Sequence, residues 1–240
     1  MSGHKAPPTN RSLPRVSSNL MNRWITFDCF GTLVDWHAGF TDILRPLAGA
    51  RTAELIAAYH EFERPLEQER PHRLYAAVLR EGVARAAAKI GLAVAPESVD
   101  ALPAHWGTQP VFADVEPALA GLRGAGWKLA VLTNCDRALF AQTQRAFHQP
   151  FDHVVTAEEV KDYKPSLAHF RHFWRVSGVA RENWIHAACS FHHDIAPARE
   201  MGVARIWVDR DRTGEDPAAA TLRIDSLAEL PAAVASLTAP

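Results

Sequence analysis

Four polar residues follow short apolar runs of the chain, where a catalytic group of an enzyme would be expected: Asp28, Thr133, Lys164 and Asp194. One carboxylate of this set can attack a substrate, and the hydroxyl can bind a substrate oxygen. The lysine can keep the attacking carboxylate ionised, while the second carboxylate orients water or a metal ion. These residue types predict a hydrolase in which Asp28 forms a covalent aspartyl-ester intermediate.

The segments that must position these residues alternate between short apolar runs and longer helical patterns. We expect strands at residues 24–27, 128–132, 153–155, 184–188 and 204–208, and helices at 115–125, 137–147, 166–177 and 194–201. The strand runs are apolar throughout, which is typical of a parallel sheet covered by helices on both faces. The pattern predicts a doubly wound α/β fold, in which ligands bind outside the carboxyl ends of the strands.

The stretch from about residue 37 to residue 106 interrupts this alternation. Its residues 41–47, 52–64 and 71–90 look helical, and no convincing strand lies between them. We therefore expect a helical cap at residues 39–107, inserted after the first strand into a core formed by residues 23–38 and 108–240. The polar, proline-containing residues 1–22 are expected to be a disordered or loosely attached tail.

The bulk composition argues against several classes of protein. The chain has 240 residues, 48% of them hydrophobic, which suffices for one large core with an insert. A net charge of -1 gives no broad electrostatic footprint for nucleic acid or for an anionic membrane. No apolar run approaches the roughly 20 residues that span a bilayer. With three cysteines and no recognisable secretory signal, a reduced protein in the cytoplasm is expected.

Four short motifs carry the polar residues, and each motif follows an expected strand. In chain order they read Asp-x-Phe-Gly-Thr-Leu, Leu-Thr-Asn, Tyr-Lys-Pro and Ser-x-x-x-Asp-Ile. In this order they resemble the motifs of the haloacid dehalogenase superfamily, and the resemblance covers residues 24 to about 210. It implies a Rossmann-like core with a cap inserted after the first motif. It also implies that Asp28 is the nucleophile and that Thr133, Lys164 and Asp194 are its catalytic partners.

Two positions bear on the choice between the phosphatases and the dehalogenases of this superfamily. Phosphatases usually carry an acid two residues after the nucleophile, because an alkoxide leaving group needs a proton; this chain has Phe30 there. They also commonly carry an acid just before the serine of the fourth motif, where this chain has Cys189. Only Asp28 and Asp194 would then remain to hold Mg²⁺, which prefers oxygen ligands. A halide leaves without a proton, so the resemblance is closest to the L-2-haloacid dehalogenases and favours no metal cofactor.

Resemblance to this branch implies a two-stage reaction on a small 2-haloacid. Asp28 displaces the halide, and water oriented by Asp194 then hydrolyses the ester to a 2-hydroxy acid. Asn134 stands at a halide-contacting position of the branch. The cap arginine of the branch has no aligned counterpart here, which leaves Tyr59, His60 or Arg64 for its place. The expected substrate-binding residues are Phe30, Thr32, Asn134, Ser190, Trp36, Tyr59 and His60.

Other interpretations of the same residues stay open at this point. The main alternative is a Mg²⁺-dependent phosphatase or phosphonate hydrolase with Asp28 and Asp194 as metal ligands. The second is a non-catalytic binding protein on the same scaffold, against which the complete set of motif residues argues. Asp28 and Asp194 could also cap helices, and Thr133 with Asn134 could turn the chain. Members of this branch are often dimers, so a homodimer is a possible assembly.

Overall fold

A parallel sheet of six strands forms the centre of the computed structural model, which describes residues 22–148 and 150–238. The strand order is β3-β2-β1-β4-β5-β6. The predicted α/β fold is confirmed, whereas the expectation for a tail at residues 1–22 falls, except for Asn22, outside the described residues. The bounds are β1 Trp24–Phe27, β2 Lys128–Thr133, β3 His153–Thr156, β4 Trp184–Ala188, β5 Ala204–Val208 and β6 Leu222–Ile224.

The last strand, β6, was not expected from the sequence. It has three residues, and its middle residue Arg223 is exposed, so it offers no apolar run to recognise. Its backbone pairs with β5 in parallel register, Ile206 opposite Leu222. Tertiary pairing with a neighbouring strand, and not local preference, therefore defines this edge of the sheet.

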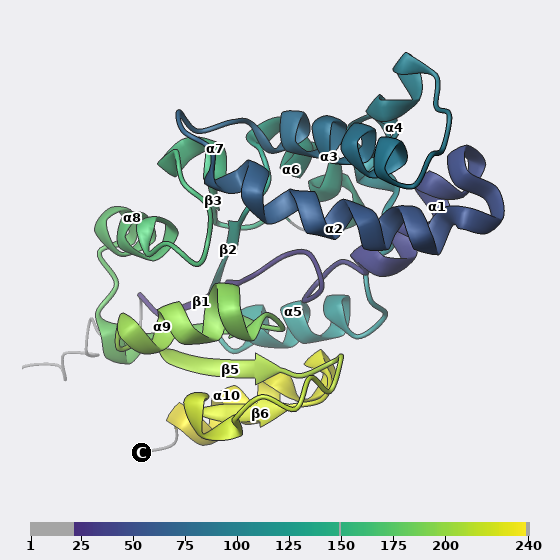
Figure 1. Cartoon of the computed structure of the whole chain (residues 1–240). Helices are drawn as coiled ribbons and strands as arrows, with labels where there is room; N and C mark the ends of the chain where they lie inside the picture. The colour runs from purple at the N-terminus through teal and green to yellow at the C-terminus, as the bar shows by residue number, and fades with distance from the viewer. Residues whose placement is uncertain (1–21, 149, 239–240) are drawn as a thin grey trace, which may run out of the picture.

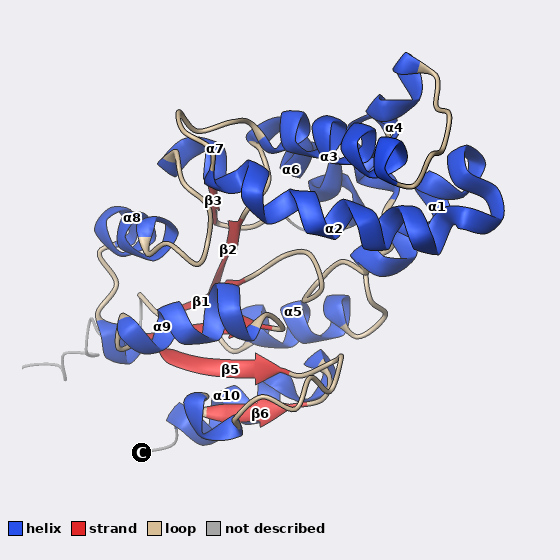
Figure 2. Ribbon diagram, in the orientation of Figure 1, coloured by secondary structure: helices blue, strands red, loops and turns tan. Residues whose placement is uncertain are grey.

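Helices cover both faces of the sheet, as Figure 2 shows. Alternate residues of β2 belong to different buried clusters: Leu129 and Val131 lie with residues of α5 and α10, while Ala130 and Leu132 lie with residues of α8 and α9. This alternation is what the pleat of a strand produces. The helix bounds are α5 Val115–Gly124, α6 Arg137–Thr143, α7 Ala157–Val160, α8 Ala168–Ser177, α9 Ala196–Glu200 and α10 Leu230–Thr238.

Strand order places β1 next to β2 on one side and β4 on the other. Trp24 pairs with Lys128 of β2 and with Trp184 of β4. The chain moves outward from β1 to β3 and then returns to β4, so the order of the sheet reverses beside the carboxyl end of β1. This reversal is the point at which open α/β sheets bind ligands.

The helix expected at residues 194–201 is interrupted at its start. Residues Phe191–Ile195 form a π-helical turn, and α9 begins at Ala196. The backbone N–H groups of Asp194 and Ile195 both donate to the carbonyl of Ser190, at 3.1 and 3.2 Å, and the Ser190 hydroxyl accepts from His193 N. Asp194 consequently lies inside a wide turn and not at the first position of a helix.

The helices α1–α4 lie between β1 and α5 (Figure 1), and no strand interrupts them in residues 37–107, all of which the structure describes. The helices α2 and α3 run side by side, and their buried residues join the cluster that contains β1. Whether residues 39–107 act as a separate cap domain stays a proposal. The bounds are α1 Trp36–Ala48, α2 Thr52–Gln68, α3 Tyr75–Lys89 and α4 Ala101–Ala104.

Two of these helices begin where polar side chains accept their first N–H groups. The helix α1 starts earlier than expected, because Asp35 Oδ1 accepts from Ala38 N at 3.0 Å. The helix α3 starts at Tyr75 and not near residue 71, because the carboxylate of Asp136 accepts from Tyr75 N and Ala76 N, both at 2.7 Å. Within the described residues, no helix is long and apolar enough to cross a bilayer.

Candidate active site

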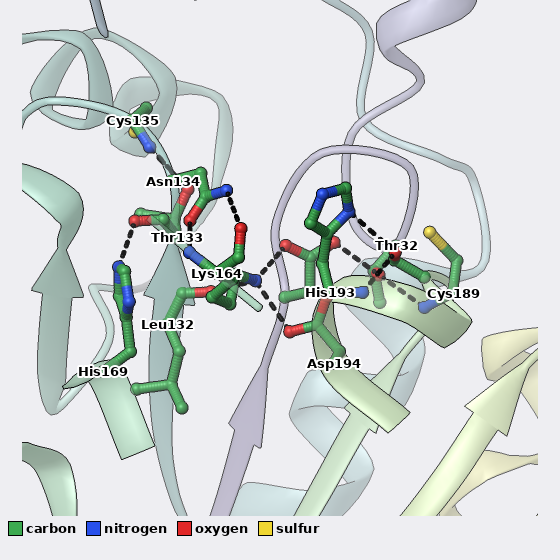
Figure 3. A network of polar contacts seen from close by, with 12 residues as sticks. Thr32, Leu132, Thr133, Asn134, Cys135, Lys164, His169, Cys189, His193 and Asp194 are labelled. Atoms are coloured by element: carbon green, nitrogen blue, oxygen red, sulfur yellow. Dashed lines mark hydrogen bonds and ion pairs between the residues drawn. The ribbon is translucent and has the colours of Figure 1, made fainter. Parts of the chain in front are cut away.

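The carboxylates of Asp28 and Asp194 meet at one lysine. Lys164 Nζ lies 2.8 Å from Asp28 Oδ1, 2.7 Å from Asp194 Oδ1 and 2.9 Å from the carbonyl oxygen of Leu132. Figure 3 shows this ammonium between its acceptors. An ammonium has three hydrogens, so these contacts use its full donor capacity. Lys164 is 2% exposed, and its side chain therefore serves to hold the two carboxylates in place.

The charges of this cluster depend on one another. Burial raises the pKa of Asp28, an effect that the Lys164 ammonium reduces and the Asp194 charge reinforces. Burial also opposes ionisation of Asp194, but Lys164 and His186 outweigh it and lower the pKa of Asp194 to about 2. Although burial acts against it, the two carboxylates raise the pKa of Lys164. At neutral pH the site therefore holds a charged Lys164 and an ionised Asp194. They lie beside Asp28, whose raised pKa makes its carboxylate a stronger base.

A chain of hydrogen bonds reaches Asp194 from inside the sheet. Trp184 Nε1 donates to Thr26 Oγ1 at 2.8 Å, and this hydroxyl lies 2.9 Å from His186 Nδ1. His186 Nε2 lies 3.1 Å from Asp194 Oδ1 and donates to it, because a carboxylate can only accept. The sequence analysis missed His186, although a histidine inside the apolar run of β4 is a usable signal. Its place identifies it as a positioning residue for Asp194.

The second oxygen of Asp194 differs from the first. Asp194 Oδ2 is buried and has no hydrogen-bond partner among the described side chains and backbone groups. Asp194 also lines the cavity described below. A buried carboxylate oxygen without a partner is costly, so this atom has a free acceptor position for a water molecule or a ligand.

The other oxygen of Asp28 is held by Thr32. Thr32 Oγ1 donates to Asp28 Oδ2 at 2.9 Å and accepts from Cys189 N at 2.9 Å. Thr32 is fully buried and does not line the cavity. The expected direct contact between Thr32 and substrate therefore has no support in this geometry; the hydroxyl orients the carboxylate of Asp28.

Thr133 is the last residue of β2, and Asn134 follows it beside this cluster. Asn134 Oδ1 accepts from Lys164 N at 2.7 Å, and Asn134 Nδ2 donates to the carbonyl of Lys164 at 3.2 Å. The Asn134 amide thus fixes the backbone of the lysine, which was not foreseen, and one of its N–H groups remains for a ligand. The carbonyl of Thr133 accepts from His169 Nε2 at 3.1 Å. Both Thr133 and Asn134 line the cavity.

A cavity of about 530 Å³ opens in front of these residues, between the strand ends and the helices α1–α3. Nine of the residues predicted for the site line it: Asp28, Thr133, Lys164, Asp194, Phe30, Asn134, Ser190, Trp36 and His60. Phe30 packs against Trp106, with ring centroids 4.7 Å apart. The predicted residues therefore converge on one space, as the ends of parallel strands should.

Tyr59 is the second predicted residue that does not reach this cavity. Its side chain is fully buried, and its hydroxyl donates to Glu63 Oε1 at 3.1 Å. The expected contact of Tyr59 with substrate therefore has no support, because its side chain does not line the cavity. The cavity wall at this level is formed by Glu63, Glu67 and Tyr75, none of which the sequence analysis singled out. The i, i+4 spacing of Tyr59, Glu63 and Glu67 along one helix face was the available signal.

Comparison with known proteins places this arrangement in a family. The family model of haloacid dehalogenase-like hydrolases matches residues 23–202 of the chain. The chain belongs to the haloacid dehalogenase-like hydrolases. The match includes all four motifs and the helices α1–α4 between the first and the second. The resemblance inferred from the motifs is therefore confirmed, and with it the chain's membership of a hydrolase family.

Relatives of this haloacid dehalogenase-like hydrolase that are similar in sequence are phosphatases. The phosphoserine phosphatase of Thermus thermophilus is 34% identical over 126 residues, 50% of this chain and 50% of that protein. The glyceraldehyde 3-phosphate phosphatase of Methanocaldococcus jannaschii is 31% identical over 118 residues, 47% of this chain and 51% of that protein. The chain thus spans about half the length of the curated relatives it matches.

Solved structures similar to this haloacid dehalogenase-like hydrolase include dehalogenases. An L-2-haloacid dehalogenase gives a TM-score of 0.79 at 20% identity, with 88% of this chain and 98% of that chain covered. The L-2-haloacid dehalogenase of Xanthobacter autotrophicus gives 0.76 at 18% identity, with 89% and 98% covered. At these identities the likeness shows the fold, while the choice of substrate depends on the residues of the cavity.

Phosphatases of the superfamily use Mg²⁺, so the donors of this site were compared with that ion's preferences. Three of the four oxygens of Asp28 and Asp194 are bound to Lys164 or Thr32. Cys189, a poor ligand for a hard cation, stands at the position of a further acid. Among the residues described, no group of three or more His, Cys, Asp or Glu side chains could hold a metal ion. With Cys189 in place of a further acid, the site offers Mg²⁺ two carboxylates, which Lys164 already neutralises in part.

Proposed function

We propose that this hydrolase removes halide from small 2-haloacids and releases 2-hydroxy acids through an ester on Asp28. The observation that carries the proposal is the wall next to the nucleophile. Phe30, two residues after Asp28, lines the cavity and packs on Trp106. An aromatic ring cannot give a proton to an alkoxide, whereas a halide needs none. The fold shared with L-2-haloacid dehalogenases adds support by analogy.

In the first stage the Asp28 carboxylate attacks the carbon that carries the halogen. Lys164 and Thr32 hold its two oxygens, so the carboxylate enters the reaction already oriented. An oxygen of Asp28 forms the new C–O bond, and the electron pair of the carbon–halogen bond leaves with the halide. The N–H of Asn134 that Lys164 does not use is a donor for that halide.

In the second stage water hydrolyses the ester at the carboxyl carbon of Asp28. Asp194 Oδ2, which is buried without a partner among the described residues, is placed to hold this water. The water oxygen joins the Asp28 carbon, and one proton of this water passes by way of Asp194 to the ester oxygen, which leaves with the product as its 2-hydroxyl group. The other proton goes to solvent as Asp28 regains its carboxylate. His186 and Lys164 keep Asp194 ionised and oriented while the water reacts. The substrate carboxylate would be bound by Thr133 and Ser190, which line the cavity.

A phosphatase is the second candidate, and the two phosphatase relatives favour it. Those matches cover about half of the chain, and Cys189 stands where phosphatases commonly carry a further acid. A non-catalytic binding role would leave the buried Asp28–Lys164–Asp194 cluster without a function.

A cytoplasmic location and a homodimer remain proposals from the sequence.

Halide release is the direct test of the proposed function. The purified protein would be incubated with 2-chloropropanoate and, in parallel, with a panel of phosphate monoesters, each with and without EDTA. We expect chloride release that EDTA does not change, and no phosphate release. Hydrolysis of the phosphate esters alone, or loss of chloride release in EDTA, would refute the dehalogenase.

A further inference from the structure

The cavity wall opposite the strand ends contains a carboxyl group that receives no hydrogen bond from the residues that the structure describes. Glu67 lies on α2, lines the cavity and is 8% exposed. Its neighbour Arg70 donates from Nη1 to the backbone carbonyl of Glu67 and not to its side chain. Its oxygens are not among the fully buried polar atoms that lack a partner, so they remain accessible. A ligand in the cavity can therefore bind them in place of water.

Glu63, one turn earlier on α2, is bound on all sides. Its Oε1 accepts from the hydroxyls of Tyr59 and Tyr75, and its Oε2 lies 3.1 Å from His60 Nδ1. Burial opposes the charge of Glu63, but His60 and Tyr75 outweigh this effect and lower its pKa. Glu63 therefore contributes a fixed negative charge beside the free carboxyl of Glu67.

Acidic side chains outnumber lysine and arginine side chains around the cavity. The lysine and arginine side chains that line it are Lys164 and Arg64. Lys164 is shared by Asp28 and Asp194, and Arg64 Nη2 contacts His192 Nε2 at 3.1 Å. Against these stand Asp28, Asp194, Glu63, Glu67, Asp211 and Glu215. Such a lining disfavours a second anionic group on the substrate and favours a cation.

The apolar part of the wall is aromatic, which suits the same kind of ligand. Trp106 lies between Phe30 and Tyr75, with ring centroids at 4.7 and 5.6 Å, and Phe40 lies 6.0 Å from it. Trp36 continues this wall and packs edge-on against Phe40 at 5.4 Å. Faces of aromatic rings attract ammonium groups, most strongly where water is excluded.

We propose that Glu67 and the aromatic wall bind a cationic amino group, so that the preferred substrate carries an ammonium group besides the carbon that Asp28 attacks. The inference rests on the proposed function only in placing the reacting carbon at Asp28. It explains why the helices α1–α3 bring acids and aromatic rings into the cavity.

Binding of a cation at Glu67 exchanges a proton for the ligand. Burial and the charge of Glu63 raise the pKa of Glu67 well above its usual range, although Arg64 and Lys164 act in the opposite direction. The charge of Glu67 in turn raises the pKa of the nearby hydroxyls of Tyr59, Tyr75 and Tyr163. Because the raised pKa of Glu67 favours the protonated acid, arrival of an ammonium group favours loss of that proton to solvent and formation of a carboxylate–ammonium pair.

Two ligands of equal length test the proposal: 4-aminobutanoate and pentanoate, which differ by an ammonium in place of a methyl group. Calorimetric titration of the wild type should show 4-aminobutanoate binding about tenfold or more tightly. Repetition in buffers of different ionisation enthalpy should reveal that protons are released when 4-aminobutanoate binds. In Glu67→Gln, which keeps the shape of the neutral acid, the preference and the proton release should both disappear.

Glu61→Gln is the matched control, because Glu61 lies on the same helix with an exposed side chain paired to Lys89. It should keep the preference. Equal affinity for the two ligands, no binding of either, or a preference that survives in Glu67→Gln would overturn the proposal. Chloride release from 2-chloropropanoate, which has no amino group, tests the dehalogenase separately. If the protein released no chloride from 2-chloropropanoate but still preferred 4-aminobutanoate, the proposed reaction would be refuted and the proposed cation site would be kept.

Discussion

Lys164 Nζ donates to Asp28 Oδ1 at 2.8 Å, from a side chain with almost no solvent exposure. The same ammonium reaches Asp194 Oδ1 and the carbonyl of Leu132, so it has no hydrogen left for a substrate. Its effect on the reaction is therefore indirect: it keeps the buried carboxylate of Asp28 charged and fixes the direction from which Asp28 attacks.

Replacing Lys164 by methionine should destabilise the protein and abolish turnover. Two buried carboxylates would then face each other without a cation, and removal of one partner of a buried ion pair typically costs about 3–5 kcal/mol. Urea unfolding measures the loss. Lys161→Met changes an exposed lysine three residues earlier, so it should change the free energy of unfolding little. A Lys164→Met protein as stable as this control would show that the buried cluster does not need the cation.

Asp194→Asn should separate the two stages of the reaction. Asparagine cannot hold the water in the same way, so Asp28 should still displace halide while the ester persists. Intact-protein mass spectrometry after acid quench should show the mass of the acyl group on the peptide that contains Asp28. Asp211→Asn, which changes another acid of the cavity lining, should leave no such adduct. Halide release by Asp194→Asn without any protein-bound ester would contradict the assignment of Asp194.

His169 should make the stability of the protein depend on pH. Burial, followed by the charge of Lys164, lowers the pKa of His169 from 6.5 to about 3. The unfolded chain thus binds a proton that the folded protein excludes. This contribution is complete above pH 6.5 and is lost as the pH falls toward 3, with a slope of about 1.4 kcal/mol per pH unit.

The check on His169 is urea unfolding of the wild type and of His169→Gln between pH 8 and pH 5. Glutamine keeps an N–H for the Thr133 carbonyl but does not titrate. The free energy of unfolding of the variant should fall less steeply below pH 6.5. Parallel curves for the two proteins would mean that His169 takes up no extra proton on unfolding.

The motif residues were predictable because parallel strands bring their carboxyl ends to one edge of a sheet. Asp28, Thr133 and Asp194 all follow or end strands that the apolar runs reveal, and the structure places them together. Five of the six strands were expected for the same reason. Local sequence patterns were sufficient wherever a buried run marked the element.

Features that depend on distant partners were not predictable. The start of α3 at Tyr75 is set by Asp136, 61 residues away in sequence. The burial of Tyr59 follows from its packing against Phe40 and its hydrogen bond to Glu63. Neither contact can be predicted from the position of Tyr59 in its helix. In the sequence, Glu67 cannot be distinguished from a surface acid of a helix, because only the packing of α2 in the fold places it in the cavity wall.

The covalent ester on Asp28 is the central claim, and ¹⁸O labelling tests it most directly. Enzyme in excess over 2-chloropropanoate would react once in H₂¹⁸O, after which the peptide with Asp28 and the product would be analysed by mass spectrometry. Asp28→Asn, which should be inactive, is the control for background exchange. The account predicts ¹⁸O in the Asp28 carboxylate and an unlabelled 2-hydroxy acid. Label in the product alone, with Asp28 unlabelled, would contradict it.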